Sequence, residues 1–327
     1  MTALLEVQNL KTHFISNQKM IPAVDGVDLH IQKGETVALV GESGSGKSIT
    51  SLSIMRLVPS PPGKIVDGHI YFNGIDLARI PEEEMYPIRG NEISMIFQEP
   101  MTSLNPVLTI GEQITEVLMY HKKISKKEAL RKAAELLEMV GFSRGKELLK
   151  EYPHRLSGGM RQRVMIAIAM SCNPKLLIAD EPTTALDVTI QAQILDLMKD
   201  VSKQFQTSIL LITHDLGVIS EIADRVFVMY CGQVVEEASV EALFNEPYHP
   251  YTAGLINSIP SIDKDTDRLI PIQGNVPSPE NYPIGCRFAS RCPHAFDRCL
   301  REVPRLKPKG DSRAVRCFLF EQKEDNT

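Results

Sequence analysis

Apolar runs separated by turn residues divide the first third of this chain into strand-sized segments. Residues 5–31 alternate between apolar and polar positions and are interrupted at 16–18, which predicts a pair of antiparallel strands. Residues 36–40 form a continuous apolar run, which is typical of a strand buried on both faces. Two shorter strands are predicted at 69–72, before the turn Asn73-Gly74, and at 93–98.

Helical spacing of apolar residues begins after the last of these strands. It predicts helices at 110–120 and 126–140. We interpret residues 99–172 as a helical unit inserted into a larger α/β domain that spans residues 1–237. The other elements predicted for that domain are a helix at 158–171, a strand at 176–181, a helix at 189–205, a strand at 208–213, and a strand pair at 225–230 and 233–237.

The composition is that of an ordinary globular protein and excludes several classes. The chain has 327 residues, a formal net charge of −5 and a pI near 6.0, so it lacks the positive charge that binds nucleic acid without regard to sequence. The N-terminal residues carry no basic flank and no sustained apolar run, which argues against a secretory signal peptide. No apolar run approaches the ~18 residues that span a bilayer. We therefore expect a cytoplasmic protein whose membrane role depends on partners.

Residues 41–48 carry the most informative motif, G-E-S-G-S-G-K-S. The glycines allow the backbone to form a concave loop whose N–H groups face phosphate oxygens, and the following helix adds its positive N-terminal end. In such a P-loop Lys47 reaches the β- and γ-phosphates, and the Ser48 hydroxyl occupies one position on Mg²⁺. The predicted nucleotide site in this stretch consists of Gly41, Ser43, Gly44, Ser45, Gly46, Lys47, Ser48 and Ile49.

A second helix start has the character of an anion site. Ser157 can cap the helix at 158–171, and the paired glycines Gly158 and Gly159 free backbone N–H groups at its positive end. A plain helix cap accounts for the serine but not for both glycines. We therefore predict that this helix start binds an anion.

Charged residues directly follow two of the apolar strands. The strand at 176–181 ends in Asp180 and Glu181, whose burial is costly unless a metal ion or a water molecule engages them. We predict that Asp180 holds Mg²⁺ through its water shell and that Glu181 accepts a proton from an attacking water. His214 follows the strand at 208–213, at the carboxyl edge where parallel sheets bind ligands, and we predict that it senses the γ-phosphate.

One aromatic side chain is a candidate contact for adenine. Phe14 lies near the end of the first predicted strand. An exposed ring there could stack on an adenine ring, whereas a buried ring would belong to the hydrophobic core. The sequence alone leaves both alternatives open.

The order and spacing of these motifs resemble those of an ATP-binding cassette subunit. The resemblance covers about residues 4–240 and implies a P-loop core of the RecA type with an antiparallel β subdomain and an inserted helical subdomain. Two residues depart from the usual pattern, Met160 where glutamine is usual and Ile49 where threonine is commoner, and neither supplies an essential side chain. The segments that resemble the Walker A, Q-loop, signature, Walker B, D-loop and H-loop are 41–48, Gln98, 156–160, 176–181, 185–187 and His214.

The resemblance also implies how these residues act together. Each nucleotide would lie between two ATPase subunits, so each site would be built from two chains. The implied catalytic residues are Lys47, Glu181 and His214. The implied Mg²⁺ ligands are Ser48, Gln98 and Asp180. The residues implied to close over the nucleotide of a second subunit are Ser157, Gly158, Gly159 and Asp187.

Narrower features resemble the oligopeptide/dipeptide importers of bacteria, whose close relatives carry nickel or other small solutes. The segments that carry this resemblance are 97–106, 243–252 and 286–299. It implies a subunit that couples ATP hydrolysis to peptide import and pairs with a similar but distinct ATPase. Two membrane permeases and an extracytoplasmic peptide-binding protein would complete the transporter, and the chain would be peripheral at the cytoplasmic face of the membrane.

Two alternatives remain at this point. The first is a soluble cassette ATPase of DNA repair or translation that closes on nucleic acid. Such proteins usually carry long coiled-coil insertions or two cassettes in one chain, and this sequence has neither, while its acidic charge also argues against nucleic acid. The second is an importer of nickel or another solute, because selectivity in such systems lies in other polypeptides.

Residues 238–327 form a proline-rich extension in which four cysteines cluster. Four sulfur ligands suit zinc or an iron–sulfur cluster, and the wide spacing favours the larger cluster over a tight zinc site. The resemblance implies a [4Fe-4S] cluster, which would stabilise a segment with only one predicted helix, at 251–259; four free thiols are the alternative. Cys172 and Cys231 are expected to be packed thiols. The candidate cluster ligands are Cys286, Cys292, Cys299 and Cys317.

Overall fold

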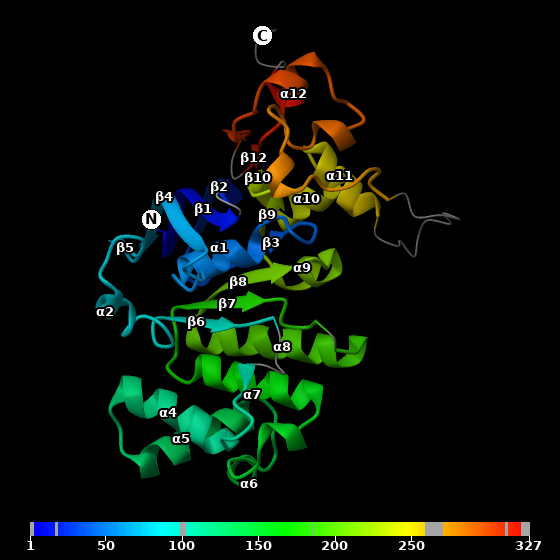
Figure 1. The fold of residues 1–327 in the computed structure, drawn as a ribbon. Coiled ribbons are helices and arrows are strands. Elements are labelled where there is room, and N and C mark those ends of the chain that lie inside the picture. The colour runs from blue at the N-terminus through cyan, green and yellow to red at the C-terminus, as the bar shows by residue number, and fades with distance from the viewer. Residues whose placement is uncertain are drawn as a thin grey trace. The chain divides into compact units, whose positions relative to one another are not determined.

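The computed structural model describes residues 3–16, 19–98, 103–184, 186–258, 271–310 and 313–321. The chain divides into two compact units, and strands and helices in both confirm the predicted α/β class (Figure 1). Unit 1 comprises Met1–His30, Val37–Ala78 and Thr213–Thr327, and unit 2 comprises Ile31–Thr36 and Arg79–Ile212.

A four-stranded sheet in unit 1 contains both N-terminal strands. Its order is β2-β1-β4-β5, so β1 and β2 are neighbours, as the alternating pattern of residues 5–31 predicts. β1 and β4 pair antiparallel, with Leu5 opposite Phe72 and Phe14 opposite Gly63. The four strands are β1 (Leu5–Ser16), β2 (Lys19–Ile31), β4 (Gly63–Phe72) and β5 (Ile75–Asp76).

β4 is longer than the strand predicted at 69–72 and begins at Gly63. The Asp67-Gly68 pair is typical of a turn in the sequence, but the sheet accommodates it as an irregularity in the pairing with β1. Gly68 has a φ of +96°, and a Cβ atom there would meet the carbonyl oxygen of Asn9 at 2.6 Å. Only glycine fits at this position, so the turn-like residue lies inside a continuous strand.

Unit 1 also contains strands of a second, larger sheet. β3 (Thr36–Val40) is parallel to β9 (Arg225–Tyr230), and β9 is antiparallel to β10 (Gln233–Ser239). All five residues of β3 are buried, as its apolar run predicts. Cys231 and Gly232 both have positive φ and form the predicted turn between β9 and β10. The helices α1 (Lys47–Ile54) and α9 (Leu216–Ile222) belong to the same unit.

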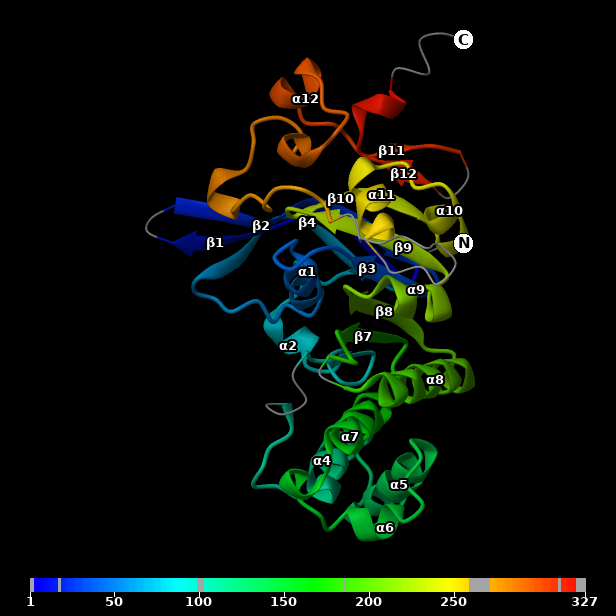
Figure 2. The ribbon, with the colours of Figure 1, turned by 90° about the vertical axis from the view of Figure 1, so that its right-hand side faces the viewer.

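Unit 2 contains three parallel strands and the inserted helices. β6 (Ile93–Ile96) pairs with β7 (Leu176–Asp180), and β7 pairs with β8 (Ser208–Thr213). Because these strands run parallel, the residues that follow β6 and β7 lie at the same edge of the sheet. Figure 2 shows the helices α4 to α6 grouped beside α7. The helices are α2 (Glu82–Met85), α4 (Ile110–Lys122), α5 (Lys126–Met139), α6 (Gly145–Leu148), α7 (Gly158–Met170) and α8 (Val188–Phe205).

The first two inserted helices, predicted from apolar spacing alone, each begin at a capping side chain. Thr109 and Glu112 form a capping box at the start of α4, in which the Glu112 carboxylate accepts from the Thr109 backbone N–H at 2.8 Å. Ser125 caps α5. The helices predicted at 110–120 and 126–140 are therefore confirmed, while residues 99–102, at the start of the predicted helical unit, lie outside the described residues. Among the helices of the described ranges, none combines the length with the apolar character that a membrane span requires.

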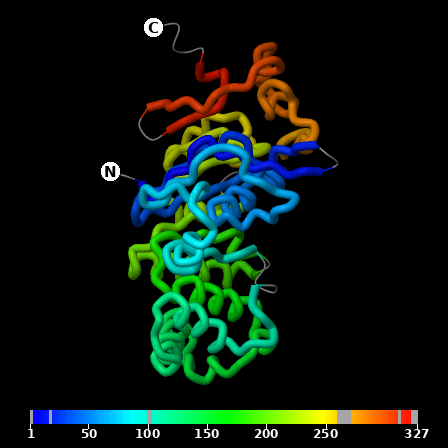
Figure 3. Tube along the Cα trace, turned by 60° about the vertical axis from the view of Figure 1, so that its left-hand side comes forward, coloured from blue at the N-terminus to red at the C-terminus, as the bar shows by residue number. Residues whose placement is uncertain are grey.

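The C-terminal extension has little regular structure in its described part, as predicted, but it does add strands to the sheet. β12 (Ala314–Val315) pairs with β10, and β11 (Lys307–Pro308) pairs with β12. In Figure 3 the red trace of this segment runs beside the yellow trace of β10. The helices are α10 (Val240–Asn245), α11 (Pro250–Asn257) and α12 (Asp297–Arg301). α11 corresponds to the helix predicted at 251–259, whose last residue, Ile259, lies outside the described residues.

Glu236 of β10 fixes the start of the extension. Its fully buried carboxylate accepts from the backbone N–H groups of Tyr248 at 2.7 Å and His249 at 2.8 Å, and it pairs with Arg313 at 3.5 Å. Burial raises the pKa of Glu236 above its ordinary value. Burial lowers the pKa of His249 to about 3, so the ring is neutral and its Nδ1 accepts from the Tyr251 N–H at 3.0 Å. These contacts set the position of Tyr251.

Candidate functional site

The loop between β3 and α1 adopts a backbone that requires glycine at two positions. Gly41 has a φ of +152°, and a Cβ atom there would meet the carbonyl oxygen of Met229 at 2.1 Å. Gly46 has a φ of +103°, and a Cβ atom would meet the carbonyl oxygen of Ala23 at 2.6 Å. The loop is therefore packed directly against β9 and β2, and any side chain at either position would displace it.

Lys47 bonds to the backbone at the start of its own loop. The side chain is 6% exposed, and its Nζ donates to the carbonyl oxygens of Gly41 at 2.7 Å and Glu42 at 3.0 Å. Gly46 precedes α1 and, having no side chain, makes no side-chain cap hydrogen bond to the first turn of the helix. Ser45 Oγ is buried and has no hydrogen-bond partner within the described part of the chain. This arrangement fits a loop that exchanges internal contacts for phosphate oxygens.

The predicted carboxylates lie at the carboxyl edge of the strands in unit 2. Asp180 is the last residue of β7 and is 4% exposed. Glu181 follows it, and Glu181 Oε2 accepts from Gln98 Nε2 at 3.0 Å and from Thr184 Oγ1 at 2.9 Å. The structure thus brings together Gln98 and Glu181, which are 83 residues apart. Thr184 was not predicted as a site residue, and no pattern in the sequence distinguishes it from an ordinary turn residue.

The backbone at Glu181 is in the left-handed region, with a φ of +47°. A residue with a side chain occupies this region at a cost of about 1–2 kcal/mol. Its N–H donates to the carbonyl oxygen of Ile212 at 2.8 Å, which holds the turn in place. Strain of this kind collects at functional sites, because the surrounding contacts must maintain it. The observation therefore favours a chemical function for Glu181 over a solvated turn.

The predicted signature residues form an exposed helix start in unit 2. Ser157 caps α7 by accepting from the Met160 N–H at 3.3 Å, as predicted, and Ser157 and Gly158 are exposed. A Cβ atom at Gly159 would meet Ile190 Cγ2 at 2.7 Å, so packing against α8 also requires this glycine. Asp187 caps α8 by accepting from the Ile190 N–H at 3.0 Å. Ala185, the first residue of the predicted D-loop, lies outside the described residues.

His214 and Phe14 occupy the elements that the sequence predicts. His214 directly follows β8 and is exposed. The next residue, Asp215, caps α9 by accepting from the Gly217 and Val218 N–H groups. The ring of Phe14 is half-buried against Gly63, where an added Cβ atom would meet Phe14 Cε1 at 2.9 Å. A contact between Phe14 and adenine stays a prediction.

All four predicted cysteines of the extension line one small pocket in unit 1. Burial raises the pKa of Cys286 to about 11 and that of Cys317 to about 12, so in the absence of a bound cation they are neutral thiols. The described residues contain no group of three or more His, Cys, Asp or Glu side chains set for a metal ion. The four thiols therefore share a pocket without forming a ready-made coordination shell. Cys172 and Cys231 are buried elsewhere, as predicted for packed thiols.

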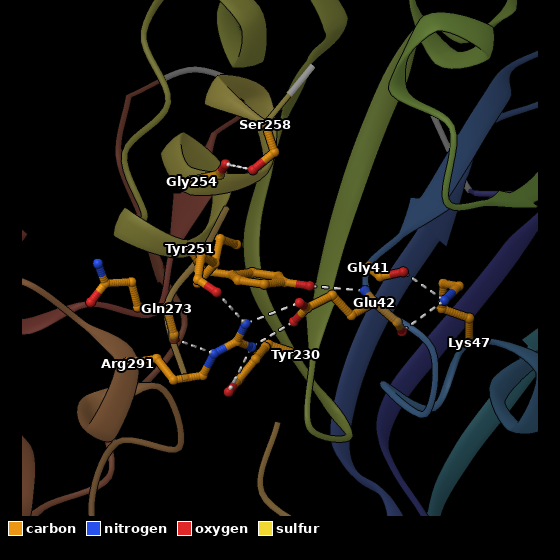
Figure 4. A network of polar contacts seen from close by, with 10 residues as sticks. Gly41, Glu42, Lys47, Tyr230, Tyr251, Gly254, Ser258, Gln273 and Arg291 are labelled. Atoms are coloured by element: carbon orange, nitrogen blue, oxygen red, sulfur yellow. Dashed lines mark hydrogen bonds and ion pairs between the residues drawn. The ribbon is translucent and has the colours of Figure 1, made fainter. Parts of the chain in front are cut away.

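A network between the extension and the P-loop is the largest feature that the sequence did not predict. Figure 4 shows Arg291 directed at the carboxylate of Glu42 and Tyr251 directed at the backbone of the same residue. Tyr251 lies in the segment 243–252 that resembles peptide importers, and Arg291 lies between two of the cysteines. Neither position carries a motif for contact with a P-loop, so only the folded chain reveals it.

Comparison with known proteins identifies two family regions in the chain. Residues 24–184 match the family model described as ABC transporter. Residues 235–299 match the model described as oligopeptide/dipeptide transporter, C-terminal region. The second match includes three of the four cysteines, Cys286, Cys292 and Cys299.

Several curated relatives match almost the whole chain. The chain is 70% identical over 322 residues to the oligopeptide transport ATP-binding protein AppD of Bacillus subtilis (strain 168). This alignment covers 98% of both proteins. It is 52% identical over 320 residues to the oligopeptide transport ATP-binding protein OppD of the same strain, which covers 98% of this chain and 89% of the relative. It is 50% identical over 326 residues to the dipeptide transport ATP-binding protein DppD, which covers 100% of this chain and 97% of the relative.

Solved structures match the cassette part of the fold. The dimeric ATP-binding cassette MJ0796, in a post-hydrolysis state bound to ADP and Pi, has a TM-score of 0.65 and 30% identity and covers 72% of this chain and 98% of its own. CbiO1 from Clostridium perfringens, part of the ABC transporter complex cbiONQ, has a TM-score of 0.64 and 25% identity. The match covers 75% of this chain and 92% of CbiO1. With motifs, fold and near full-length relatives in agreement, the chain belongs to the ABC transporter family of ATP-binding proteins, in the branch that carries the oligopeptide/dipeptide transporter C-terminal region.

Proposed function

We propose that this chain is the ATP-hydrolysing subunit of a membrane transporter that imports oligopeptides or dipeptides. The observation that carries the proposal is the strained Glu181, held by Gln98 and Thr184 at the carboxyl edge of β6 and β7. Relatives with 50–70% identity are named as oligopeptide or dipeptide transport ATP-binding proteins, which supports peptides as the solute. These names also favour peptides over nucleic acid or nickel.

The P-loop would bind the phosphates of ATP by an exchange of hydrogen bonds. Lys47 Nζ now donates to two carbonyl oxygens at the start of its own loop, those of Gly41 and Glu42. Phosphate oxygens carry more negative charge than carbonyl oxygens and would take over these donors. The N–H groups of residues 44–49 would complete the phosphate contacts at the N-terminus of α1.

Three oxygen-bearing side chains fit a hard cation such as Mg²⁺: Ser48, Gln98 and Asp180. Asp180 is buried and carries the only carboxylate of the three, which suits a ligand that acts through ordered water. When bound, Mg²⁺ offsets the negative charge on the phosphates.

Glu181 would act as the general base. Its carboxylate is oriented by Gln98 and Thr184, and it would accept a proton from the water that attacks the γ-phosphorus. His214 would hold the γ-phosphate from its exposed position after β8. Phe14 would contact the adenine ring.

Each reaction centre would be completed by a second subunit. The N-terminus of α7, with the exposed Ser157 and Gly158 followed by Gly159, presents backbone N–H groups that suit a phosphate of a nucleotide bound by the second subunit. Asp187 lies at the start of the adjacent helix α8. We propose that the second ATPase is a distinct but similar chain and that two permeases and a peptide-binding protein complete a transporter, with this chain at the cytoplasmic face of the membrane.

We further propose that Cys286, Cys292, Cys299 and Cys317 hold a [4Fe-4S] cluster. The supporting observation is that four thiols from distant positions line one nearly apolar pocket, together with Phe288 and Phe318. Four thiolates are the usual ligand set of such a cluster. The cluster would cross-link segments of an extension whose described part has only short helices and two-residue strands. Iron and acid-labile sulfide in anaerobically prepared protein would support it, and their absence would contradict it.

Peptide uptake by the assembled transporter tests the proposed function. Proteoliposomes that contain this chain with its partner subunits should take up a labelled peptide only when ATP is supplied at the ATPase face. Substitution Lys47→Ala should abolish this uptake, because the buried ammonium that binds the phosphates is lost. ATP-dependent uptake of nickel without uptake of peptide would contradict the proposal.

A further inference from the structure

The extension reaches the P-loop through one buried arginine. Arg291 has a side chain that is only 4% exposed, and its two terminal nitrogens bind both carboxylate oxygens of Glu42, at 2.6 Å and 3.0 Å. Glu42 is the second residue of the P-loop. The two side chains form a bidentate ion pair, a geometry that fixes the orientation of both groups as well as the distance between them.

Every part of the Arg291 guanidinium is engaged. Nε donates to the carbonyl oxygen of Gln273 at 3.1 Å, Nη2 donates to that of Ile272 at 3.4 Å, and Nη1 donates to Tyr230 Oη at 3.4 Å. The hydrogen bonds that Arg291 donates to the Glu42 carboxylate raise the pKa of Arg291, so its guanidinium is always charged. The arginine is therefore a fixed part of the extension that points at the loop.

Glu42 is held from three directions, as Figure 4 shows. Its carboxylate is held by Arg291, its backbone N–H donates to Tyr251 Oη at 2.9 Å, and its carbonyl oxygen accepts from Lys47 Nζ at 3.0 Å. Two of these three contacts come from residues beyond position 250. The peptide that holds Lys47 in place is thus itself held by the extension.

A second arginine supports the other end of the same loop. Arg287 binds the carbonyl oxygen of Cys231 and the carboxylate of Asp25. The neighbouring Gly232 N–H donates to the carbonyl oxygen of Ser45 at 2.8 Å. The extension therefore contacts the loop directly at Glu42 and through the β9–β10 turn at Ser45.

We propose that Arg291 is a positioning residue for nucleotide binding, and that it acts by holding Glu42 so that the P-loop is kept in its phosphate-binding conformation. The Arg291 side chain is buried while that of Glu42 is 30% exposed, so desolvation of the arginine offsets much of the attraction and stability alone does not account for the pair. A loop that is already ordered loses less conformational entropy when ATP binds. The inference rests on the function proposed for the P-loop.

Equilibrium binding of a fluorescent ATP analogue, mant-ATP with Mg²⁺, to the full chain tests the proposal. Arg291→Ala should weaken binding roughly tenfold, within the usual range for energetic coupling between sites. Glu42→Gln should weaken it to a similar extent, and the double variant should be no weaker than the worse single variant, because both remove one interaction. Arg291→Lys keeps the charge but loses the bidentate hydrogen bonds, so its affinity for mant-ATP should lie between those of wild type and Arg291→Ala.

Arg298→Ala is the matched control. Arg298 also lies in the extension, but its ion pairs join Glu302 at 2.9 Å and Glu321 at 3.0 Å within the extension itself. Its loss should leave mant-ATP affinity within about twofold of wild type, as expected for a surface ion pair. An equal loss of affinity in Arg298→Ala and Arg291→Ala would show a general effect of disturbing the extension and would overturn the proposal.

The kinetic signature separates positioning from damage to the fold. In the assembled ATPase, Arg291→Ala should raise the KM for ATP while kcat changes by less than about twofold, because the base is untouched. Unchanged KM and unchanged mant-ATP affinity in both Arg291→Ala and Glu42→Gln would overturn the inference. If Lys47→Ala binds mant-ATP as tightly as wild type, the function proposed for the P-loop fails instead, which distinguishes the two failures.

Discussion

The P-loop and the C-terminal extension are ordered by different interactions. The P-loop joins a fully buried strand to a helix, so backbone hydrogen bonds and a hydrophobic core hold its ends. The described part of the extension has two-residue strands and short helices, and its arginines donate to backbone carbonyl oxygens at distant positions. These bonds join Arg287 to Cys231, Arg291 to Gln273, Arg313 to Glu246 and Arg316 to Val234.

The difference explains where each region is sensitive to substitution. A strand and a helix tolerate the loss of one polar contact, because many backbone bonds remain. The extension depends on a few charged side chains and on four thiols in one pocket, so the loss of a buried one of these side chains should cost about 1–3 kcal/mol of stability. The comparison also shows that the irregular region supports the regular one at Glu42.

The largest effect is expected at the reaction centre, where chemistry and binding can be separated. Glu181→Gln should lower kcat for ATP hydrolysis by about 10²–10⁴-fold, the usual contribution of a general base, and leave ATP binding unchanged. Steady-state hydrolysis and mant-ATP binding measure the two quantities. Glu92→Gln is the control. Glu92 pairs with Lys175 at 2.6 Å, and these residues directly precede β6 and β7, at the end of the strands opposite to Glu181. Full turnover in Glu181→Gln would remove Glu181 as the base.

A smaller effect should test whether the thiol pocket orders the extension. Cys286→Ala should lose bound iron and lower the Tm of the anaerobic protein by about 4 °C, if the cluster is saturated and contributes roughly 3 kcal/mol. Cys172→Ala alters a thiol that is 1% exposed and lies outside the pocket, and it should keep its full iron content. Equal iron content in the two variants would contradict the ligand assignment.

The smallest effect concerns a single arginine that holds the extension. Arg316 Nε donates to the carbonyl oxygen of Val234 at 2.8 Å and Nη1 to that of Pro304 at 3.2 Å, and burial lowers its pKa. Arg316→Met should destabilise the chain by about 1–3 kcal/mol, because buried carbonyl groups lose their donors. Arg301→Met removes an exposed side chain that pairs with Asp297 at 3.9 Å and should change stability by less than about 0.5 kcal/mol. Thermal unfolding compares the two, and similar melting temperatures would show that the arginine contacts do not order the extension.

The sequence predicts the regions whose structure is local. The capping residue Ser157, the buried run at 36–40 and the P-loop motif each describe contacts within a few positions. The pairing of Gln98 with Glu181 follows from parallel strands, whose carboxyl ends meet at one edge. These parts of the fold and site therefore follow from period, capping and turn chemistry.

The remaining features depend on contacts between distant residues. Arg291 and Glu42 are 249 residues apart, and neither belongs to a periodic pattern that would indicate the other. The N-terminal half of β4 was missed because Asp67-Gly68 is typical of a turn, and β11 and β12 are too short to carry a period. Gly159 was assigned to anion binding alone, whereas Ile190 of α8 also requires a glycine there.

A structure of the full chain bound to a non-hydrolysable ATP analogue and Mg²⁺ is the most direct test of the account. We expect Lys47 Nζ to leave the carbonyl oxygens of Gly41 and Glu42 and to bind the β- and γ-phosphates, while Arg291 still holds the Glu42 carboxylate. A triphosphate bound away from residues 41–48, or a Lys47 that keeps both carbonyl contacts beside a bound triphosphate, would contradict it.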